Sequence, residues 1–250
     1  MRTGFVAVPT ADGPMRVYEA VPGAGDGPTA RGAVVVVQEA FGVNEHIQDV
    51  TARFAAAGYD AVAPELFHRG GDGLTGPYGD FARVLELFGS VPGDDAVLVD
   101  VDAALDHLRG RGHPDRRIAV VGFCFGGRVS FLVAARRALG AAVGFYGGGI
   151  VTARFPRFPP LVGEAAGLRT PWLGLFGDED PSIPVEDVER LRAALAGAAV
   201  AGEVVRYAGA GHGFHCDARA DHHPRAAADA WARTLAWLDR HLGAPAPAAP

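Results

Sequence analysis

Residues 118–127 read Ile-Ala-Val-Val-Gly-Phe-Cys-Phe-Gly-Gly, an apolar run that leads into a cysteine between two glycines. This is the G-x-S-x-G pattern of a nucleophile elbow, with Cys124 in the place of serine. Gly122 and Gly126 lack the Cβ atoms that would collide in so tight a turn. The pattern therefore predicts a strand, a sharp turn that carries Cys124, and a helix whose free N–H groups favour a thiolate and an oxyanion.

The alternative is a structural cysteine in a glycine-rich turn, with or without a phosphate bound there. The stretch contains neither a G-x-G-x-x-G pattern nor a P-loop pattern. An apolar strand before Cys124 and a helix after it are what a nucleophile elbow requires. The sequence favours the elbow.

Outward from the elbow, short apolar runs alternate with helical patterns, which is typical of an α/β fold with a mainly parallel sheet and helices on both faces. The expected strands are Phe5–Val8 and Met15–Glu19 around a turn at Asp12-Gly13, then Ala33–Val37, Tyr59–Ala63, Arg117–Val121, Ala141–Tyr146, Trp172–Phe176 and Glu203–Tyr207. The expected helices are Glu45–Ala57, Asp80–Phe88, Asp94–Arg109, Gly126–Leu139, Val185–Ala196 and Arg225–His241. We expect one domain over residues 1–242 and a disordered tail over 243–250, which is rich in Pro and Ala.

Composition excludes several classes of function. The chain has 250 residues and a net charge of −6, so it lacks the clustered basic side chains that nucleic-acid and membrane-surface binders need. No apolar run approaches the ~20 residues of a membrane span, and the N-terminus lacks the apolar core of a secretory signal. We therefore expect a cytoplasmic protein, either a monomer or a homodimer, with its two cysteines reduced.

An acid and a base follow Cys124 in the chain order that this elbow requires. Residues 177–184 read Gly-Asp-Glu-Asp-Pro-Ser-Ile-Pro after an expected strand, and we assign the acid to Asp180 rather than Asp178. A turn or helix-capping carboxylate is the alternative for this residue. His212, between Gly211 and Gly213, is the expected base, because imidazole exchanges protons near neutral pH.

The first buried strand is followed by Gln-Glu-Ala-Phe-Gly-Val-Asn at 38–44. The loop at this point normally supplies one oxyanion N–H, and the residue after the nucleophile supplies the other. We expect Ala40 and Phe125 to fill these roles through their backbones. Glu39 is unexpected beside an oxyanion hole, and it fits a part in the proton chemistry of the thiol.

These motifs together resemble the dienelactone hydrolase family, of the α/β-hydrolase superfamily. The resemblance covers almost the whole chain, in order: QEAFGVN, VAPELF, VGFCFGG, LFGDEDPSIP and AGHGF. It implies hydrolysis of a small-molecule lactone or ester through a cysteinyl acyl-enzyme, without a cofactor. It also implies that Glu39 interacts with the thiol and helps to form the thiolate when substrate arrives.

One departure concerns the substrate. Members of the family carry an arginine soon after the H-x-F motif that holds a substrate carboxylate, whereas this chain has Cys216 there and Arg219 further on. A second arginine, expected after VAPELF, has Arg69 and Arg83 as candidates. The candidate substrate contacts are Phe41, Arg83, Tyr146, Phe214 and Arg219.

Three other functions deserve comparison. A metal site has candidate ligands in His212, His215, Cys216, Asp217, Asp221, His222 and His223, but their spacing matches no standard pattern, and we expect no metal. A ligand receptor built on a hydrolase fold usually lacks one or more members of the triad, whereas this sequence has all three. A thioesterase or peptidase would share the mechanism and differ in its pocket.

Overall fold

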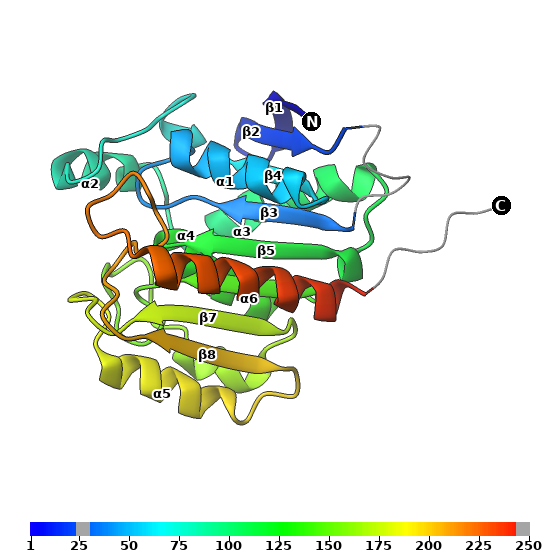
Figure 1. Ribbon diagram of the computed structural model, residues 1–250. Helices are drawn as coiled ribbons and strands as arrows, with labels where there is room; N and C mark the ends of the chain where they lie inside the picture. The colour runs from blue at the N-terminus through cyan, green and yellow to red at the C-terminus, as the bar shows by residue number, and fades with distance from the viewer. Residues whose placement is uncertain (24–30, 244–250) are drawn as a thin grey trace.

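A computed structural model describes residues 1–23 and 31–243, so the tail expected over 243–250 lies outside the described residues beyond Gly243. The described strands form one eight-stranded sheet in the order β1-β2-β4-β3-β5-β6-β7-β8 (Figure 1). Their bounds are β1 Arg2–Thr10, β2 Gly13–Val21, β3 Ala33–Val37, β4 Asp60–Pro64, β5 Ile118–Phe123, β6 Ala141–Phe145, β7 Trp172–Gly177 and β8 Gly202–Tyr207.

The sheet is parallel except at one edge. β1 pairs with β2 and β2 with β4 in antiparallel fashion, while all neighbours from β4 to β8 are parallel. The hairpin between β1 and β2 turns at Ala11-Asp12, one residue before the predicted Asp12-Gly13. Gly13 pairs with Thr10 at a φ of 110°, so it begins β2 instead of completing the turn. The predicted fold class, a mainly parallel α/β sheet, is confirmed.

Helices cover both faces of the sheet. Figure 1 shows α1 and α6 in front of the sheet and α3 and α4 behind it. The helix bounds are α1 Glu45–Ala56, α2 Phe81–Gly89, α3 Asp94–Gly110, α4 Phe125–Arg136, α5 Val185–Leu195 and α6 Pro224–Leu242. Three short 3₁₀ turns, at His68–Gly70, Asp115–Arg117 and Val162–Gly167, were not predicted.

Burial explains why the central strands are continuous apolar runs. Every residue of β3, β5 and β6 is buried, because helices cover both faces of the sheet there. Each fully buried Val or Phe side chain contributes about 1.5–3 kcal/mol of transfer free energy. The rigid centre of the sheet therefore holds the loops at its carboxyl edge.

The carboxyl ends of the parallel strands meet at one edge of the sheet, at the left of Figure 1, where α2 and the loop before α6 also lie. Open α/β sheets bind ligands at this edge. The residues after β3, β5, β7 and β8 include all the predicted catalytic positions. The sheet therefore brings them to one place.

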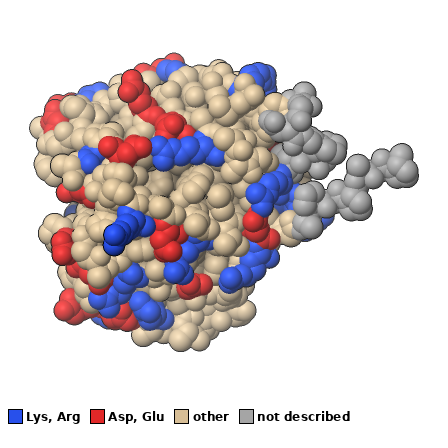
Figure 2. Space-filling view, viewed as in Figure 1, with Lys and Arg blue, Asp and Glu red and all other residues tan. Residues whose placement is uncertain are grey.

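The surface in Figure 2 carries acidic and basic side chains side by side, with no single basic face on the side shown. Among the described helices, none is both long and apolar enough to cross a membrane.

Candidate active site

The elbow at Cys124 has the strained geometry that the sequence predicts. β5 ends at Phe123 and α4 begins at Phe125, and Cys124 between them has φ 53° and ψ −111°. A Cβ on Gly122 would lie 1.8 Å from the carbonyl oxygen of Gly126, so the turn requires glycine. A non-glycine residue in this backbone region costs on the order of 1–3 kcal/mol, which the surrounding sheet must offset.

Three side chains from three different loops form a connected chain. His212 Nε2 lies 3.1 Å from Cys124 Sγ. His212 Nδ1 lies 2.6 Å from Asp180 Oδ2. The structure therefore places the predicted nucleophile, base and acid in contact, in the order that proton transfer requires.

Electrostatics favour the protonated imidazole. Burial alone would lower the pKa of His212, but the Cys124 sulfur and the hydrogen-bonded Asp180 carboxylate together raise it to about 10. Burial tends to raise the pKa of Asp180, but the hydrogen bonds from His212 and Ser182 hold it below its usual value. A cationic ring beside the sulfur stabilises a thiolate, which is the reactive form of cysteine.

Ser182 is a member of this cluster that the sequence analysis missed. Its backbone N–H donates to Asp180 Oδ1 at 2.8 Å, and its hydroxyl donates to the same oxygen. The Ser182 hydroxyl also lies 3.3 Å from His212 Nδ1. An aspartate that bonds the N–H two residues later is an Asx turn, so the Asp-Pro-Ser sequence carried a signal for this contact.

Glu39 is fully buried beside the triad. Within the described residues neither of its carboxylate oxygens has a hydrogen bond of standard geometry, and Arg219 Nη1 approaches Oε1 at 3.7 Å. Burial raises the pKa of Glu39, although Arg219 and His212 oppose the shift. The Arg219 guanidinium and the imidazole therefore favour the ionised form of Glu39, which burial disfavours.

Arg219, and not Cys216, lines the pocket that holds Cys124 and His212. The guanidinium lies 5.8 Å from the ring centre of Phe41 and 5.5 Å from that of Tyr78. Cys216 is buried behind the pocket, where its sulfur contacts the Tyr78 hydroxyl at 3.3 Å.

The two expected oxyanion donors lie beside the nucleophile. Ala40 and Phe125 line the same pocket as Cys124 and His212. Phe125 is the first residue of α4, so its N–H has no acceptor within the helix. We propose the N–H groups of both residues as donors to a negatively charged oxygen.

The other predicted substrate contacts separate into two groups. Phe41 lines the pocket, whereas Tyr146 and Phe214 are fully buried behind His212, with the Tyr146 ring 5.1 Å from the imidazole ring. The structure does not bring Arg83 to the site, because it bonds Thr75 and Glu86 on the surface.

Arg69, the other arginine that the sequence offered, is also directed elsewhere, because it pairs with Asp12 and Asp100. Sequence spacing could not place either arginine, because Arg69 lies in the 3₁₀ turn at His68–Gly70 and Arg83 on α2, and the packing of these elements decides which partners each one meets.

The histidine-rich segment considered as a metal site does not converge. Asp217 pairs with Arg53, Asp221 pairs with Arg219, and His223 caps α6. In the part of the chain that the structure describes, no group of three or more His, Cys, Asp or Glu side chains is arranged to hold a metal ion.

A pocket of about 430 Å³ opens onto the triad. Its lining includes the polar side chains of Cys124, His212 and Arg219, together with aromatic side chains from α2, α4 and the loop after β6. The sequence did not predict this group of aromatic side chains, because its members come from two helices and one loop and share no motif.

Comparisons with known proteins agree with this architecture. The model of the dienelactone hydrolase family matches residues 18–242. A protein of Escherichia coli K12 named "Putative carboxymethylenebutenolidase" is 41% identical over 244 residues, which cover 96% of this chain and 88% of that protein. A protein of the same name from Synechocystis is 35% identical, over 92% of this chain and 94% of that protein.

Solved structures give the same result. The structure named "Putative Dienelactone Hydrolase" from Klebsiella pneumoniae superimposes with a TM-score of 0.85 at 39% identity, over 95% of this chain and 98% of that one. An esterase of Pyrococcus furiosus is similar in fold, with a TM-score of 0.71 at 15% identity over 97% and 91% of the two chains.

Proposed function

Since the chain belongs to the dienelactone hydrolase family and is a hydrolase of the α/β-hydrolase fold, we propose that it cleaves a lactone or carboxylic ester through a cysteinyl acyl-enzyme. The observation that carries the proposal is the 3.1 Å contact between Cys124 Sγ and His212 Nε2. That contact gives the sulfur a proton acceptor and gives the leaving group a proton donor.

In the first half of the reaction the Cys124 thiolate attacks the carbonyl carbon. The N–H groups of Ala40 and Phe125 bind the oxyanion of the tetrahedral intermediate. The intermediate collapses when the C–O bond breaks, and protonated His212 donates its proton to the departing alkoxide. The products are an alcohol and a thioester on Cys124; from a lactone, the alcohol stays attached to the acyl group.

In the second half water attacks the thioester. Neutral His212 accepts a proton from the water, and Asp180 keeps the ring oriented and stabilises its positive charge. The second tetrahedral intermediate releases the carboxylic acid and returns the thiolate beside the imidazolium. Ser182 holds the Asp180 carboxylate in place through two hydrogen bonds.

Glu39 and Arg219 complete the proposed site. Arg219 lines the pocket and is the proposed contact for a substrate carboxylate, in place of the arginine that Cys216 replaces. When an anionic substrate binds Arg219, the buried Glu39 carboxylate loses part of its balancing charge and favours proton uptake. Proton uptake by Glu39 removes a negative charge from beside the sulfur and so favours the Cys124 thiolate, while His212 keeps the proton that the leaving group receives.

The test compares the two cysteines of the chain. We expect Cys124→Ala to lower the turnover of p-nitrophenyl acetate and of a lactone by about 10³-fold or more, as the loss of a nucleophile does elsewhere. Cys216→Ser is the matched control, because its sulfur contacts Tyr78 and not His212, and it should retain most of the activity. A Cys124→Ala protein with the wild-type rate would refute the proposal, and saturable ligand binding without turnover in the wild type would indicate a receptor.

A further inference from the structure

Four phenylalanine rings form one wall of the pocket and have no part in the chemistry proposed above. The aromatic wall consists of Phe88, Phe125, Phe155 and Phe158, all of which line the pocket. Phe88 is central, with ring centres 4.8 Å from Phe125 and 5.4 Å from Phe155, and Phe125 lies 5.3 Å from Phe158. The rings pack edge to face and stacked, which is how aromatic groups also receive an aromatic ligand.

The wall begins at the reacting atoms. Phe125 follows Cys124 directly, and its backbone N–H is the proposed oxyanion donor. A carbonyl held between that N–H and the Cys124 sulfur therefore has the wall next to it. Substituents of that carbonyl, on its acyl or its alcohol side, enter the pocket that these rings and Arg219 line.

The stability of the folded protein does not explain two exposed apolar side chains on α2, near the aromatic wall. Phe81, on α2, lines the pocket but is 76% exposed. Leu85, one turn later on the same helix, is 58% exposed. Large apolar side chains that gather at an opening commonly mark a binding surface. A bound apolar group would cover Phe81 and stabilise the complex in proportion to the area removed from water.

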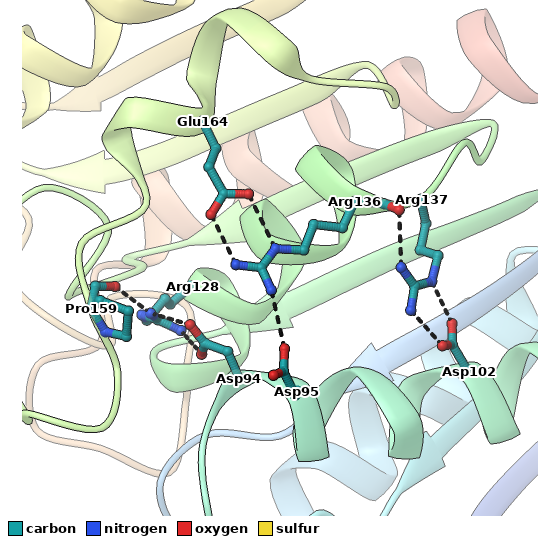
Figure 3. A network of polar contacts seen from close by, with 8 residues as sticks. All are labelled: Asp94, Asp95, Asp102, Arg128, Arg136, Arg137, Pro159 and Glu164. Atoms are coloured by element: carbon teal, nitrogen blue, oxygen red, sulfur yellow. Dashed lines mark hydrogen bonds and ion pairs between the residues drawn. The ribbon is translucent and has the colours of Figure 1, made fainter.

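The wall is preformed by a buried ion pair. Figure 3 shows Arg128, one turn after Cys124 on α4, directed at Asp94 on α3 and at the carbonyl of Pro159. The same guanidinium bonds the carbonyl of Gly149 at 3.3 Å and lies 5.3 Å from the ring centre of Phe158. It thereby ties the loop that carries Phe155 and Phe158 to two helices, so little order has to be gained when a ligand binds.

We propose that the aromatic wall binds an aryl group next to the scissile bond, so that the preferred substrates are aryl-substituted esters or lactones and not small aliphatic ones. This inference rests on the proposed function, because it names the substrate class of the same site. A pocket that accepts one added apolar group typically gains ~10- to 200-fold in kcat/KM. A phenyl ring against this wall should give a gain within that range.

The test uses three methyl and benzyl esters whose hydrolysis releases acid that a pH-stat measures: methyl acetate, methyl phenylacetate and benzyl acetate. Each kcat/KM is divided by the alkaline hydrolysis rate of the same ester to remove intrinsic reactivity. We expect at least one aryl ester to exceed methyl acetate by ~10-fold or more. Equal normalised values for the three esters overturn the inference while leaving the proposed function intact.

Two variants assign the preference to the wall. Phe155→Ala removes a half-buried ring of the wall, and Phe81→Ala removes an exposed ring at its mouth, where the loss of a side chain cannot unfold the protein. Phe155→Ala should lower the ratio of aryl to methyl ester kcat/KM by ~10-fold, and Phe81→Ala should lower it in the same direction. Phe5→Ala is the matched control, because Phe5 lies on β1 and packs on Tyr18 and Arg16. An unchanged ratio in Phe155→Ala overturns the inference.

A binding measurement separates this inference from the proposed mechanism. In a Cys124→Ala protein, calorimetry with two pairs of products, phenylacetate against acetate and benzyl alcohol against methanol, measures recognition without turnover. We expect the aryl member of at least one pair to bind at least ~10-fold more tightly, and Cys124→Ala/Phe155→Ala to lose that difference. If the wild type hydrolyses no ester but this difference in binding is found, the result supports the aromatic site and contradicts the proposed function. Equal binding within both pairs overturns the aromatic site.

Discussion

Replacement of Arg128 by methionine tests how the pocket is built. Arg128 is 2% exposed and Asp94 8%, so the ion pair lies almost wholly inside the protein. The guanidinium makes two bonds to the Asp94 carboxylate, at 2.5 Å and 2.9 Å, and one to Pro159 at 2.6 Å. Arg128→Met keeps the apolar stem but leaves a buried carboxylate and buried carbonyls without their donor.

Removal of one partner from a buried ion pair costs about 3–5 kcal/mol, because the other charge stays buried and unpaired. Removal of both charges costs much less. We therefore expect Arg128→Met to lose 3–5 kcal/mol of unfolding free energy, and Arg128→Met/Asp94→Leu to regain most of that loss. Arg136→Met is the control on the same helix, because Arg136 pairs with Glu164 at the surface (Figure 3), and an exposed pair is worth about 0–1 kcal/mol.

The assay is urea unfolding at neutral pH, followed by the fluorescence of the three tryptophans. The slope against urea must stay unchanged for the free energies to be compared. A loss below about 1 kcal/mol in Arg128→Met would show that no unpaired charge is left buried at Asp94. A double variant that is no more stable than the single one would contradict the prediction in the same way.

Three further predictions concern the triad and its surroundings. Asp180→Asn should lower kcat for p-nitrophenyl acetate by about 10³- to 10⁴-fold with little change in KM, because the ring loses its orienting carboxylate; a loss below tenfold would contradict the assignment. Glu39→Gln should lower kcat/KM for a lactone with little change in the free energy of unfolding measured in urea, and unchanged kinetics would show that Glu39 has no part in the reaction. The folded-state pKa of His212, about 10, lies above its ordinary value of 6.5, so its stabilisation is complete below pH 6.5 and is lost as pH rises through 10. The wild type should therefore lose more unfolding free energy between pH 8 and pH 11 than His212→Ala does, and parallel losses would contradict the shift.

The sequence predicted the parts of this protein that depend on local patterns. The elbow could be identified because glycines at 122 and 126 are needed wherever a strand turns so sharply into a helix. The order of Cys124, Asp180 and His212 follows from the same fold, since the loops after parallel strands meet at one edge. The ends of helices and strands differ from the predicted ones by a few residues. For example, α4 ends at Arg136, whereas the sequence predicted Leu139.

What the sequence did not predict depends on contacts between distant segments. Arg219 and Arg83 were equally plausible as substrate contacts, and only tertiary packing brings Arg219 beside Glu39 while Arg83 bonds Glu86. The aromatic wall joins residues of α2, α4 and the loop after β6, so no window of sequence contains it. The contact of Ser182 with Asp180 could have been predicted from the sequence, because the two residues are only two positions apart.

The identity of the nucleophile is tested most directly by trapping the acyl-enzyme. Wild-type protein is mixed with p-nitrophenyl acetate, quenched in acid during turnover and digested, and the peptides are identified by mass spectrometry. We expect an acetyl group on the peptide that contains Cys124, bound to its sulfur, and no such adduct in Cys124→Ala. An acetyl group on Ser182 or Cys216 during turnover, with Cys124 unmodified, would contradict it.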